Sequence, residues 1–288
     1  MPLAFLHVTE DDLYKSEPPP SWFGNPPNSA KGASPWTNEN WLKSRFHFSF
    51  AEYRNPKNSH FGVLRVMNDD LVQPQRGFGM HGHRDVEIVT YIVNGVLTHQ
   101  DSMGTRESLG RGSVQFMSAG HGIQHSEHNL EDEPLRFIQI WINTRQNGME
   151  PVYGGFDGTT SDAKAKRKNA LAQLVGDRRD SSASPPVAIE QDLKMFTAEL
   201  DASKSVSLPI ADGRQAYLLC VEGGLVAKGA AAVADGSSCT LSRHDAAEIR
   251  GEGELVLSAG EGGAHLLLLE MAAGSGGRGP GKWPMHLP

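Results

Sequence analysis

The chain has 288 residues, and two domains are the expected arrangement because single hydrophobic cores stop growing near ~250–300 residues. Its formal net charge of −7 argues against nucleic acid as the main partner, since phosphate binding needs a basic face. Its two cysteines are too few for a disulfide framework or a thiolate metal site, which favours a reducing compartment.

Targeting and membrane signals do not stand out in the sequence. The start MPLAFLHVTEDD has no basic region before its short apolar run, and no stretch approaches the roughly 20 apolar residues of a membrane helix. We therefore expect a cytoplasmic protein, with a nuclear location left open and no membrane partner. The basic run KAKRK at 164–168 could serve as a nuclear signal, but a solvated charge run is the interpretation we favour.

Residues 1–40 are expected to form an N-terminal arm. Their stretch EPPPSWFGNPPNSAKGASPW is too rich in Pro, Gly and Ser to build a regular element, although Trp22, Phe23 and Trp36 would hold it to the surface. From about Phe46, short β-type runs alternate with the turn pairs NG, MG and RG. This texture predicts an all-β barrel or sandwich domain over residues 41–153.

A second β-rich block covers residues 187–272. Its VEGGLVAKG echoes IVNGVLTHQ of the first block, and each is interpreted as a strand, a Gly turn and a strand, which favours a duplicated barrel. The linker at 154–186 is polar and is predicted to carry at most one or two helical turns. Residues 273–288 are rich in Gly and Pro and are predicted to form a flexible tail.

Six of the 12 histidines lie between positions 81 and 128, and five of these six stand in the stretches HGHRDVE and GHGIQHSEHN. Alternate side chains of a strand share a face, so His81 would point with His83, and His125 with Glu127. Two such pairs facing one another would offer three imidazoles and one carboxylate to a single ion. This set suits Fe(II), Mn, Ni, Cu or Zn better than Ca or Mg, and it leaves coordination positions open. A hydrogen-bonded polar core without metal is the alternative, although burying several ionisable groups without a partner is costly.

Four stretches together resemble the pirin family of the cupin superfamily, most closely its bacterial quercetinase-like branch. They are HFSFAEYRNPKNSHFGVLRVMNDD, GFGMHGHRDVEIVTYIVNGVLTHQDSMG, GSVQFMSAGHGIQHSEHN and LRFIQIWIN. The resemblance is dense over about residues 41–153 and loose beyond, and its H-x-H-[RK]-x-x-E and A-G-x-G-[IV]-x-H-[SA]-E motifs occur in order at family spacing.

This resemblance implies an all-β bicupin fold, made of two tandem double-stranded β-helix barrels of jelly-roll type. Only the N-terminal barrel would hold a divalent transition metal, most commonly Fe(II), with Mn, Ni, Cu, Zn or Co left open. The metal ligands implied by the family motifs are His81, His83, His125 and Glu127.

Three positions depart from the family pattern. Gly82 stands where Pro is common, which loosens the backbone between the first two histidines. His121 stands where Arg or Thr is familiar, and His128 where Met or Tyr is. An extra imidazole at the pocket edge could move protons or compete as a ligand, whereas a solvated loop residue is the interpretation favoured for His128.

The remaining residues that could bind a metal are predicted to have structural roles instead. On an unbroken strand Glu87 would share the inward face with His83, but in pirins the ligand carboxylate comes from the second motif, so Glu87 is predicted in the wall of the site. His99 and Asp101 in THQDSMG end a strand, and a hydrogen bond that closes the turn is expected there. The C-terminal half carries no H-x-H or H-x-E pair, so a metal-free barrel is expected from its scattered donors, which are His244, His265 and Glu270.

The first functional hypothesis implied by the resemblance is a metal-dependent dioxygenase that cleaves a small aromatic flavonol such as quercetin with O2. The metal would lower the pKa of the 3-hydroxyl, Glu127 would take its proton as general base, and the central ring would open with release of carbon monoxide.

The alternative is a regulatory protein whose iron oxidation state changes the surface seen by a transcription-related protein partner. A third idea is metal storage or sensing without turnover. Fold alone cannot choose between them. An apolar cavity opening to the metal would favour the enzyme, and a contiguous exposed patch would favour the switch.

Overall fold

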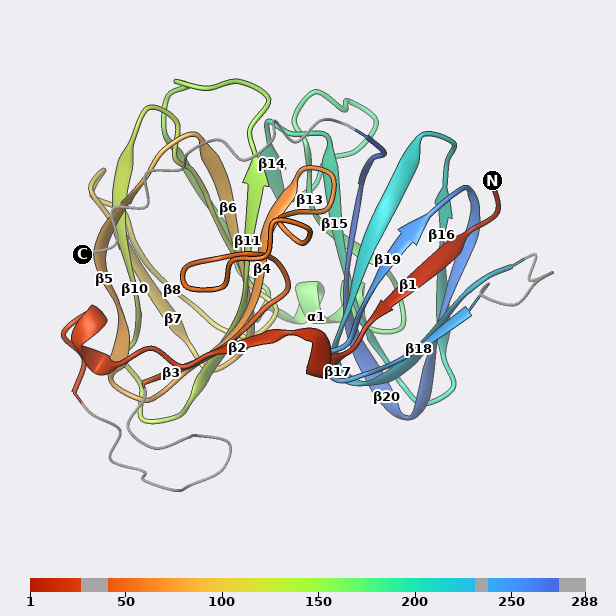
Figure 1. Ribbon diagram of the computed structural model, residues 1–288, viewed down its shortest axis with the longest axis horizontal. Helices are drawn as coiled ribbons and strands as arrows, with labels where there is room; N and C mark the ends of the chain where they lie inside the picture. The colour runs from red at the N-terminus through yellow and green to blue at the C-terminus, as the bar shows by residue number, and fades with distance from the viewer. Residues whose placement is uncertain (27–40, 231–237, 275–288) are drawn as a thin grey trace. The chain divides into compact units, whose positions relative to one another are not determined.

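The computed structural model describes residues 1–26, 41–230 and 238–274, which form two β-rich units (Figure 1). The N-terminal unit comprises Tyr14–His60 and Leu64–Thr159. The C-terminal unit comprises Met1–Leu13, Phe61–Val63 and the described residues between 160 and 274. Trp36 and most of the tail predicted at 273–288 lie outside the described residues.

The N-terminal unit contains two sheets whose strands all pair antiparallel. The larger sheet has seven strands, which lie side by side in the order β12 (Val152–Phe156), β9 (Val114–Ser118), β6 (Val86–Asn94), β11 (Leu135–Asn143), β4 (Leu64–Val72), β3 (Leu42–Phe46) and β2 (Tyr14–Ser16). The smaller sheet has four strands, in the order β5 (Arg76–His83), β10 (Ile123–Asn129), β7 (Leu97–Asp101) and β8 (Arg106–Leu109).

The core of the N-terminal unit follows from its most apolar strands. β6 reads VEIVTYIVN, and its first eight residues are all buried, as expected for a run of β-branched and aromatic residues covered on both faces. One apolar cluster gathers around Trp41 and Phe137, and a second gathers around Ile88 and Met117. Polar residues within these apolar strands must therefore find partners inside the unit.

The C-terminal unit is built on one sheet. Its main path runs β1 (Ala4–Val8), β19 (Ala246–Arg250), β17 (Arg214–Gly229), β20 (Gly253–Ala272), β15 (Leu193–Leu200), β13 (Ala172–Asp177) and β14 (Val187–Ile189). Two further strands extend it: β16 (Ser205–Ile210) pairs with β20, and β18 (Ser238–Ser242) pairs with β17. The core of this unit is aliphatic, with Leu218, Leu257 and Leu266 fully buried.

The predicted arm and linker contain more regular structure than the sequence suggested. Residues 4–8 form β1, which pairs with β19, and the short helices η1 (Glu10–Asp12) and η2 (Pro20–Trp22) follow. The predicted linker contains the end of β12, all of β13 and the helix α1 (Ser161–Arg167), whose two turns agree with the expectation. The strands in these segments form because their backbones hydrogen-bond to neighbouring strands, which local composition does not reveal.

The basic run at 164–168 is solvated at its three lysines, as predicted, but its Arg167 is buried. Lys166 binds Asp162 one helical turn earlier at 2.7 Å, and Lys168 pairs with Asp201. Arg167 is buried, and its Nε lies 3.1 Å from Glu199 Oε1. Arg167 therefore anchors α1 to β15 of the C-terminal unit.

The Gly turns were predicted correctly in the first block but not in the second. Gly95, Gly104 and Gly112 of the NG, MG and RG pairs all have positive φ, which glycine adopts without strain. In the second block, Gly223 lies inside the long strand β17, at an irregularity in its pairing with β20. A Cβ there would lie 2.2 Å from the carbonyl oxygen of Gly263, so the VEGGLVAKG stretch forms a bend in one strand instead of a hairpin.

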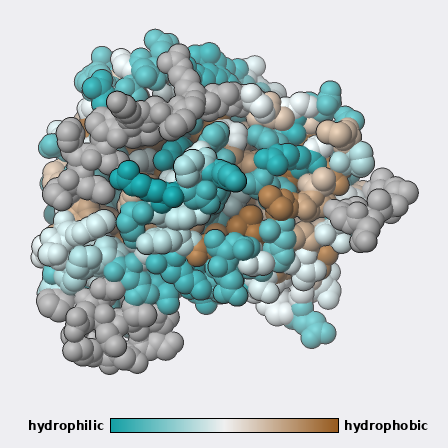
Figure 2. Space-filling view, viewed as in Figure 1, coloured by the Kyte–Doolittle hydropathy of each residue, from teal (hydrophilic) through white to brown (hydrophobic). Residues whose placement is uncertain are grey.

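Hydrophilic residues cover most of the face shown in Figure 2. The exposed large apolar side chains of the described residues are Met1, Leu6, Tyr14, Trp22, Met80, Met103 and Leu130. Among the described residues, no helix has the length and apolar character needed to cross a membrane.

A buried ion pair joins the two central strands of the larger sheet. Arg136 of β11 donates to both carboxylate oxygens of Asp69 of β4, at 2.8 and 2.7 Å. Both side chains are at most 4% exposed. A charge left without its partner in such surroundings is costly, because water cannot replace the lost bonds.

We therefore expect Arg136→Met to lower the free energy of unfolding by ~3–5 kcal/mol, measured by chemical denaturation. Arg84→Met is the matched control, because Arg84 pairs with Asp85 at 3.3 Å on an exposed surface of the same unit. The control should lose less than ~1 kcal/mol. Similar losses of unfolding free energy in the two variants would show that burial does not make the Arg136–Asp69 pair costly to break.

Candidate metal centre

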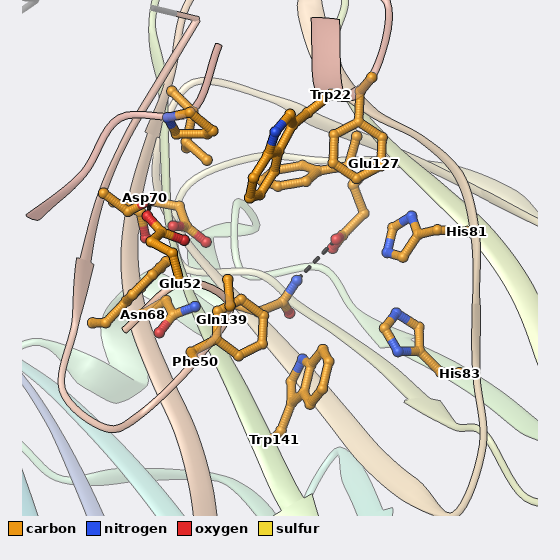
Figure 3. Close-up of a pocket in the computed structure, with 18 of the residues that line it drawn as sticks. Trp22, Phe50, Glu52, Asn68, Asp70, His81, His83, Glu127, Gln139 and Trp141 are labelled. Carbon is orange, nitrogen blue, oxygen red and sulfur yellow. Dashed lines mark hydrogen bonds between the residues drawn. The ribbon is translucent and has the colours of Figure 1, made fainter. Parts of the chain in front are cut away.

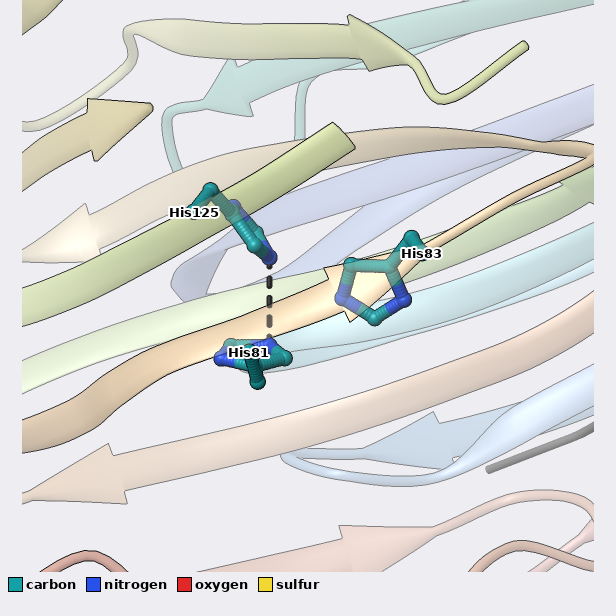
Figure 4. A group of neighbouring side chains, drawn as sticks. All are labelled: His81, His83 and His125. Carbon is teal, nitrogen blue, oxygen red and sulfur yellow. Dashed lines mark hydrogen bonds between the residues drawn. The ribbon is translucent and has the colours of Figure 1, made fainter. Parts of the chain in front are cut away.

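Strands β5 and β10 bring three histidines together. Alternation along β5 places His81 and His83 on one face, and the antiparallel register sets His125 of β10 directly opposite His81. One ring nitrogen of each histidine lies within 4.8 Å of those of the other two (Figure 4). The Nε2 atoms of His81 and His125 are 3.1 Å apart. The structure thus assembles three of the four predicted ligands around one point.

These histidines are neutral near pH 7. Burial lowers the pKa of His81, brings that of His83 to about 3, and lowers that of His125 well below its ordinary value. His81 Nδ1 lies 2.7 Å from the carbonyl oxygen of Gly79, which can only accept, so Nδ1 carries the proton and Nε2 presents a lone pair. His125 Nδ1 is buried without a hydrogen-bond partner among the described residues. A cluster of neutral imidazoles with converging nitrogens fits a transition metal.

Glu127 reaches the same cavity but is held by other partners. Its Oε1 accepts a hydrogen bond from Thr90 Oγ1 at 3.1 Å, and its Oε2 accepts one from Gln139 Nε2 at 2.8 Å. The carboxylate is not one of the group of donors within 4.8 Å of one another. Burial raises the pKa of Glu127 to about 7, against the opposing influence of these two hydrogen bonds. Its predicted role as the fourth ligand stays a prediction.

Thr90 and Gln139 hold Glu127 in place, and the sequence analysis missed both of them. They lie directly opposite each other on β6 and β11, with Thr90 Oγ1 2.7 Å from Gln139 Oε1. Both are polar residues inside otherwise apolar runs, VEIVTYIV and LRFIQIWI, and this signal could have identified them.

A cavity opens beside the histidines within the N-terminal unit (Figure 3). Glu127 and Gln139 lie between two walls: His81 and His83 stand on one side, and Glu52 and Asp70 on the other. Much of the remaining lining is aromatic, from Trp22, Phe23, Trp41, Phe46, Phe50, Phe78 and Trp141. A cavity with apolar walls and a few polar groups is typical of small-molecule sites.

His99 also lies against the cluster, from the side of β7. Its ring centroid is 5.2 Å from that of His125 and 4.8 Å from that of Tyr153, on which it stacks. Burial lowers the pKa of His99 to about 4. Asp101 Oδ1 accepts backbone hydrogen bonds from Met103 and Thr105 at 2.9 and 3.0 Å, so the predicted closure of this turn is confirmed for Asp101.

The other predicted pocket residues lie away from the cavity. Glu87 is fully buried but sits on the face of β6 opposite to Val86 and Thr90, and it does not line the cavity. The prediction assumed an unbroken strand after His83. In the structure β5 ends at His83, Asp85 has a φ of 53°, and β6 begins a new alternation at Val86.

His121 and His128 do not reach the cavity either. His121 is exposed, and its Nε2 lies 3.2 Å from Glu150 Oε2. His128 is half-buried on β10, and burial lowers its pKa. The prediction of a solvated loop residue was therefore wrong for His128: it lies on a strand, and alternation along β10 turns it to the face opposite Glu127.

The two β units and the histidine cluster define a protein of the cupin type. The pirin family model matches residues 29–142, and that of the quercetinase C-terminal cupin domain matches residues 177–271. The chain belongs to the pirin family, as its motifs predicted.

Relatives and solved structures agree with this membership. A Pseudomonas aeruginosa protein named only provisionally as a quercetin 2,3-dioxygenase is 39% identical over 82% of this chain and 94% of its own length. The quercetin 2,3-dioxygenase of Escherichia coli K12 is 38% identical over 69% of this chain and 83% of its own. The crystal structure of the E. coli pirin YhhW in complex with nickel(II) has a TM-score of 0.73 and 27% identity, covering 93% of this chain and 99% of that one.

The buried carboxyl of Asp70 makes the free energy of unfolding depend on pH. Burial raises the pKa of this carboxyl from 3.8 to about 8, against the opposing influence of the Ser44 hydroxyl. Between these values the folded protein keeps a proton that the unfolded chain releases. The stability gained by protonation is therefore complete below about pH 4 and is lost as pH rises through about 8.

Asp70→Asn cannot ionise, so its free energy of unfolding should rise relative to the wild type between pH 5 and pH 8. The expected relative gain exceeds ~1 kcal/mol, because one pKa unit corresponds to ~1.4 kcal/mol. Urea denaturation at several pH values measures it, with Glu127 unchanged in both proteins. A difference that stays constant with pH would refute a raised pKa at Asp70.

Proposed function

We propose that this protein is a metal-dependent dioxygenase that cleaves a flavonol such as quercetin with O2, in the cytoplasm. The observation that carries the proposal is the convergence of three neutral imidazoles at the edge of an aromatic cavity. The names of the relatives and the nickel complex of a related pirin support it.

The metal site would be formed by His81, His83 and His125, with Glu127 as the fourth donor. Three nitrogens and one oxygen suit Fe(II), our first choice, and also Mn, Ni, Cu, Zn or Co. When bound, the metal would lower the pKa of the substrate hydroxyl and activate O2. Glu127 could join the donor set only by rotating away from Thr90 or Gln139, which hold its two oxygens.

Glu127 is also the proposed general base. Its pKa of about 7 lets it exist as a carboxylate near neutral pH and still accept a proton readily. Thr90 and Gln139 fix the direction in which the carboxylate points. The aromatic lining would hold the planar substrate, and the burial of the site would keep water from competing.

We expect about one transition-metal ion per chain, bound in the N-terminal unit. Elemental analysis of the purified protein should show this ratio, and the double variant His81→Ala/His125→Ala should lose the ion because two of three imidazoles are gone. His244→Ala in the C-terminal unit is the control and should keep full occupancy. Retention of the ion in the double variant, or two tightly held ions per chain, would overturn the assignment.

The activity is tested by aerobic incubation of the metal-analysed protein with quercetin. Loss of flavonol absorbance together with release of carbon monoxide is expected. Loss of absorbance without carbon monoxide would indicate a different oxidation and would refute the proposed cleavage.

Glu127→Gln should suppress this cleavage far more than Glu87→Gln. The amide removes the proton acceptor, which typically costs ~100- to 10,000-fold in rate, whereas Glu87 lies on the other face of β6. Metal content must be equal in both variants before their rates are compared. A larger loss in Glu87→Gln at matched occupancy would show that the general base has been misassigned.

A further inference from the structure

The cavity has a second polar region, which we call the acceptor wall: Glu52, Asn68 and Asp70. Asn68 and Asp70 alternate on β4 and so share the face that lines the cavity, and Glu52 follows β3. Figure 3 shows these three side chains across the cavity from His81 and His83. All three residues are polar and lie at one end of the cavity.

The acceptor wall contains no cationic side chain; its own donors are the amide of Asn68 and the proton that Asp70 keeps near pH 7. Asn68 is 3% exposed, and its Oδ1 has no hydrogen-bond partner among the described residues. Asp70 is 4% exposed and forms no ion pair with any described residue. Glu52 accepts a hydrogen bond from the Ser16 hydroxyl and keeps further lone pairs. A buried oxygen such as Asn68 Oδ1 is normally satisfied, so a ligand that brings a hydrogen-bond donor would complete this part of the wall.

The charge of the cavity limits which donors fit. Arg84 is the only Lys or Arg among the described lining residues, and it follows His83 on the opposite side. The acceptor wall therefore offers no cationic partner to a carboxylate or a phosphate. Because burial raises the pKa of Asp70 to about 8, this carboxyl is mostly protonated near pH 7 and suits a neutral hydroxyl better than a cation.

The shape of the ligand is limited by the aromatic residues between the two ends. Trp22, Phe50 and Trp141 line the space that separates the histidines from the acceptor wall (Figure 3). Aromatic side chains pack well against flat rings. A ligand that reaches both ends is therefore a flat aromatic molecule with polar groups at both ends.

We propose that the acceptor wall binds phenolic hydroxyl groups at the end of the substrate remote from the histidines, and so selects polyhydroxylated aromatic substrates over those without outer hydroxyls. The inference rests on the proposed function, because it takes the histidines and their metal to anchor the other end. It assigns to Asp70 the role of a specificity-determining residue.

The test measures binding in the absence of O2, so that no turnover is needed. Quenching of tryptophan fluorescence gives the Kd of the metal-loaded protein for three ligands that share a free 3-hydroxyl. They are quercetin, 3-hydroxyflavone, and quercetin methylated at its other four hydroxyls. The second lacks the outer hydroxyls and is smaller, whereas the third lacks their donors and is larger, so size and hydrogen bonding are separated.

Wild-type protein should bind quercetin ~10-fold or more tightly than either analogue, the size expected for a buried hydrogen bond left unmade. Asp70→Leu should bring the ratio of quercetin to 3-hydroxyflavone affinity toward one. Asp70→Asn keeps an acceptor oxygen and should restore most of the preference. Glu131→Leu removes an exposed carboxylate of the same unit and should keep the wild-type ratio.

Equal affinities in the wild type, or an unchanged ratio in Asp70→Leu, would overturn the inference, as would failure to bind quercetin at all. If Asp70→Leu does not fold, the wild-type series and Asp70→Asn still decide. If the protein cleaves quercetin but does not prefer it to the two analogues, the proposed function stands and the role of the acceptor wall is refuted. If it prefers quercetin but does not cleave it, the role of the acceptor wall stands and the proposed function is refuted.

Discussion

Polar side chains that face the interior of the N-terminal unit must be satisfied there, and the candidate site depends on how this is achieved. Thr90 has one hydroxyl proton but lies within 3.1 Å of three oxygens, those of Gln115, Glu127 and Gln139. One proton cannot serve three acceptors. A protonated Glu127 supplies a further donor, which agrees with its raised pKa. Hydrogen bonds of Thr90 and Gln139 to Glu127 thus link the two sheets.

The histidines satisfy the same constraint differently. Uncharged imidazoles are cheaper to bury than carboxylates, and the low pKa values of His83 and His125 follow from that burial. The hydrogen bonding of the histidines stays incomplete, since His125 Nδ1 has no partner among the described residues. Burying imidazole nitrogens without partners costs free energy, and a metal ion that accepts their lone pairs would remove this cost. The arrangement of the three histidines therefore supports a metal site more than a polar core without metal.

The sequence predicted the parts of the site that depend on alternation within one strand. His81 with His83 required only that a strand be recognised, and the family motifs added the strand that carries His125. Glu87 was misplaced because a turn of two residues after His83 restarted the alternation, and nothing in the motif shows where β5 ends. Thr90, Gln139 and Asp70 were missed because their roles come from pairing between strands distant in the sequence.

The two halves also differed in how far composition could predict their elements. Turns of the NG type carry a local backbone signal, so three of them were placed correctly in the first block. Strand β1 and the bend at Gly223 depend on contacts with β19 and with Gly263. Such contacts are visible only in the folded chain, because the same residues would fit an irregular segment or a hairpin equally well.

His81 and His125 are separated by 44 positions in the chain, with β6, β7, β8 and β9 between them. The unfolded chain therefore contains at most the short pair of His81 and His83, and closing so long a loop has an entropic cost. The three-histidine cluster can form only late, when β5 and β10 come together. An ion bound there would favour the folded state of the N-terminal unit by mass action, so metal supply during synthesis would govern how much of the protein survives in its native form.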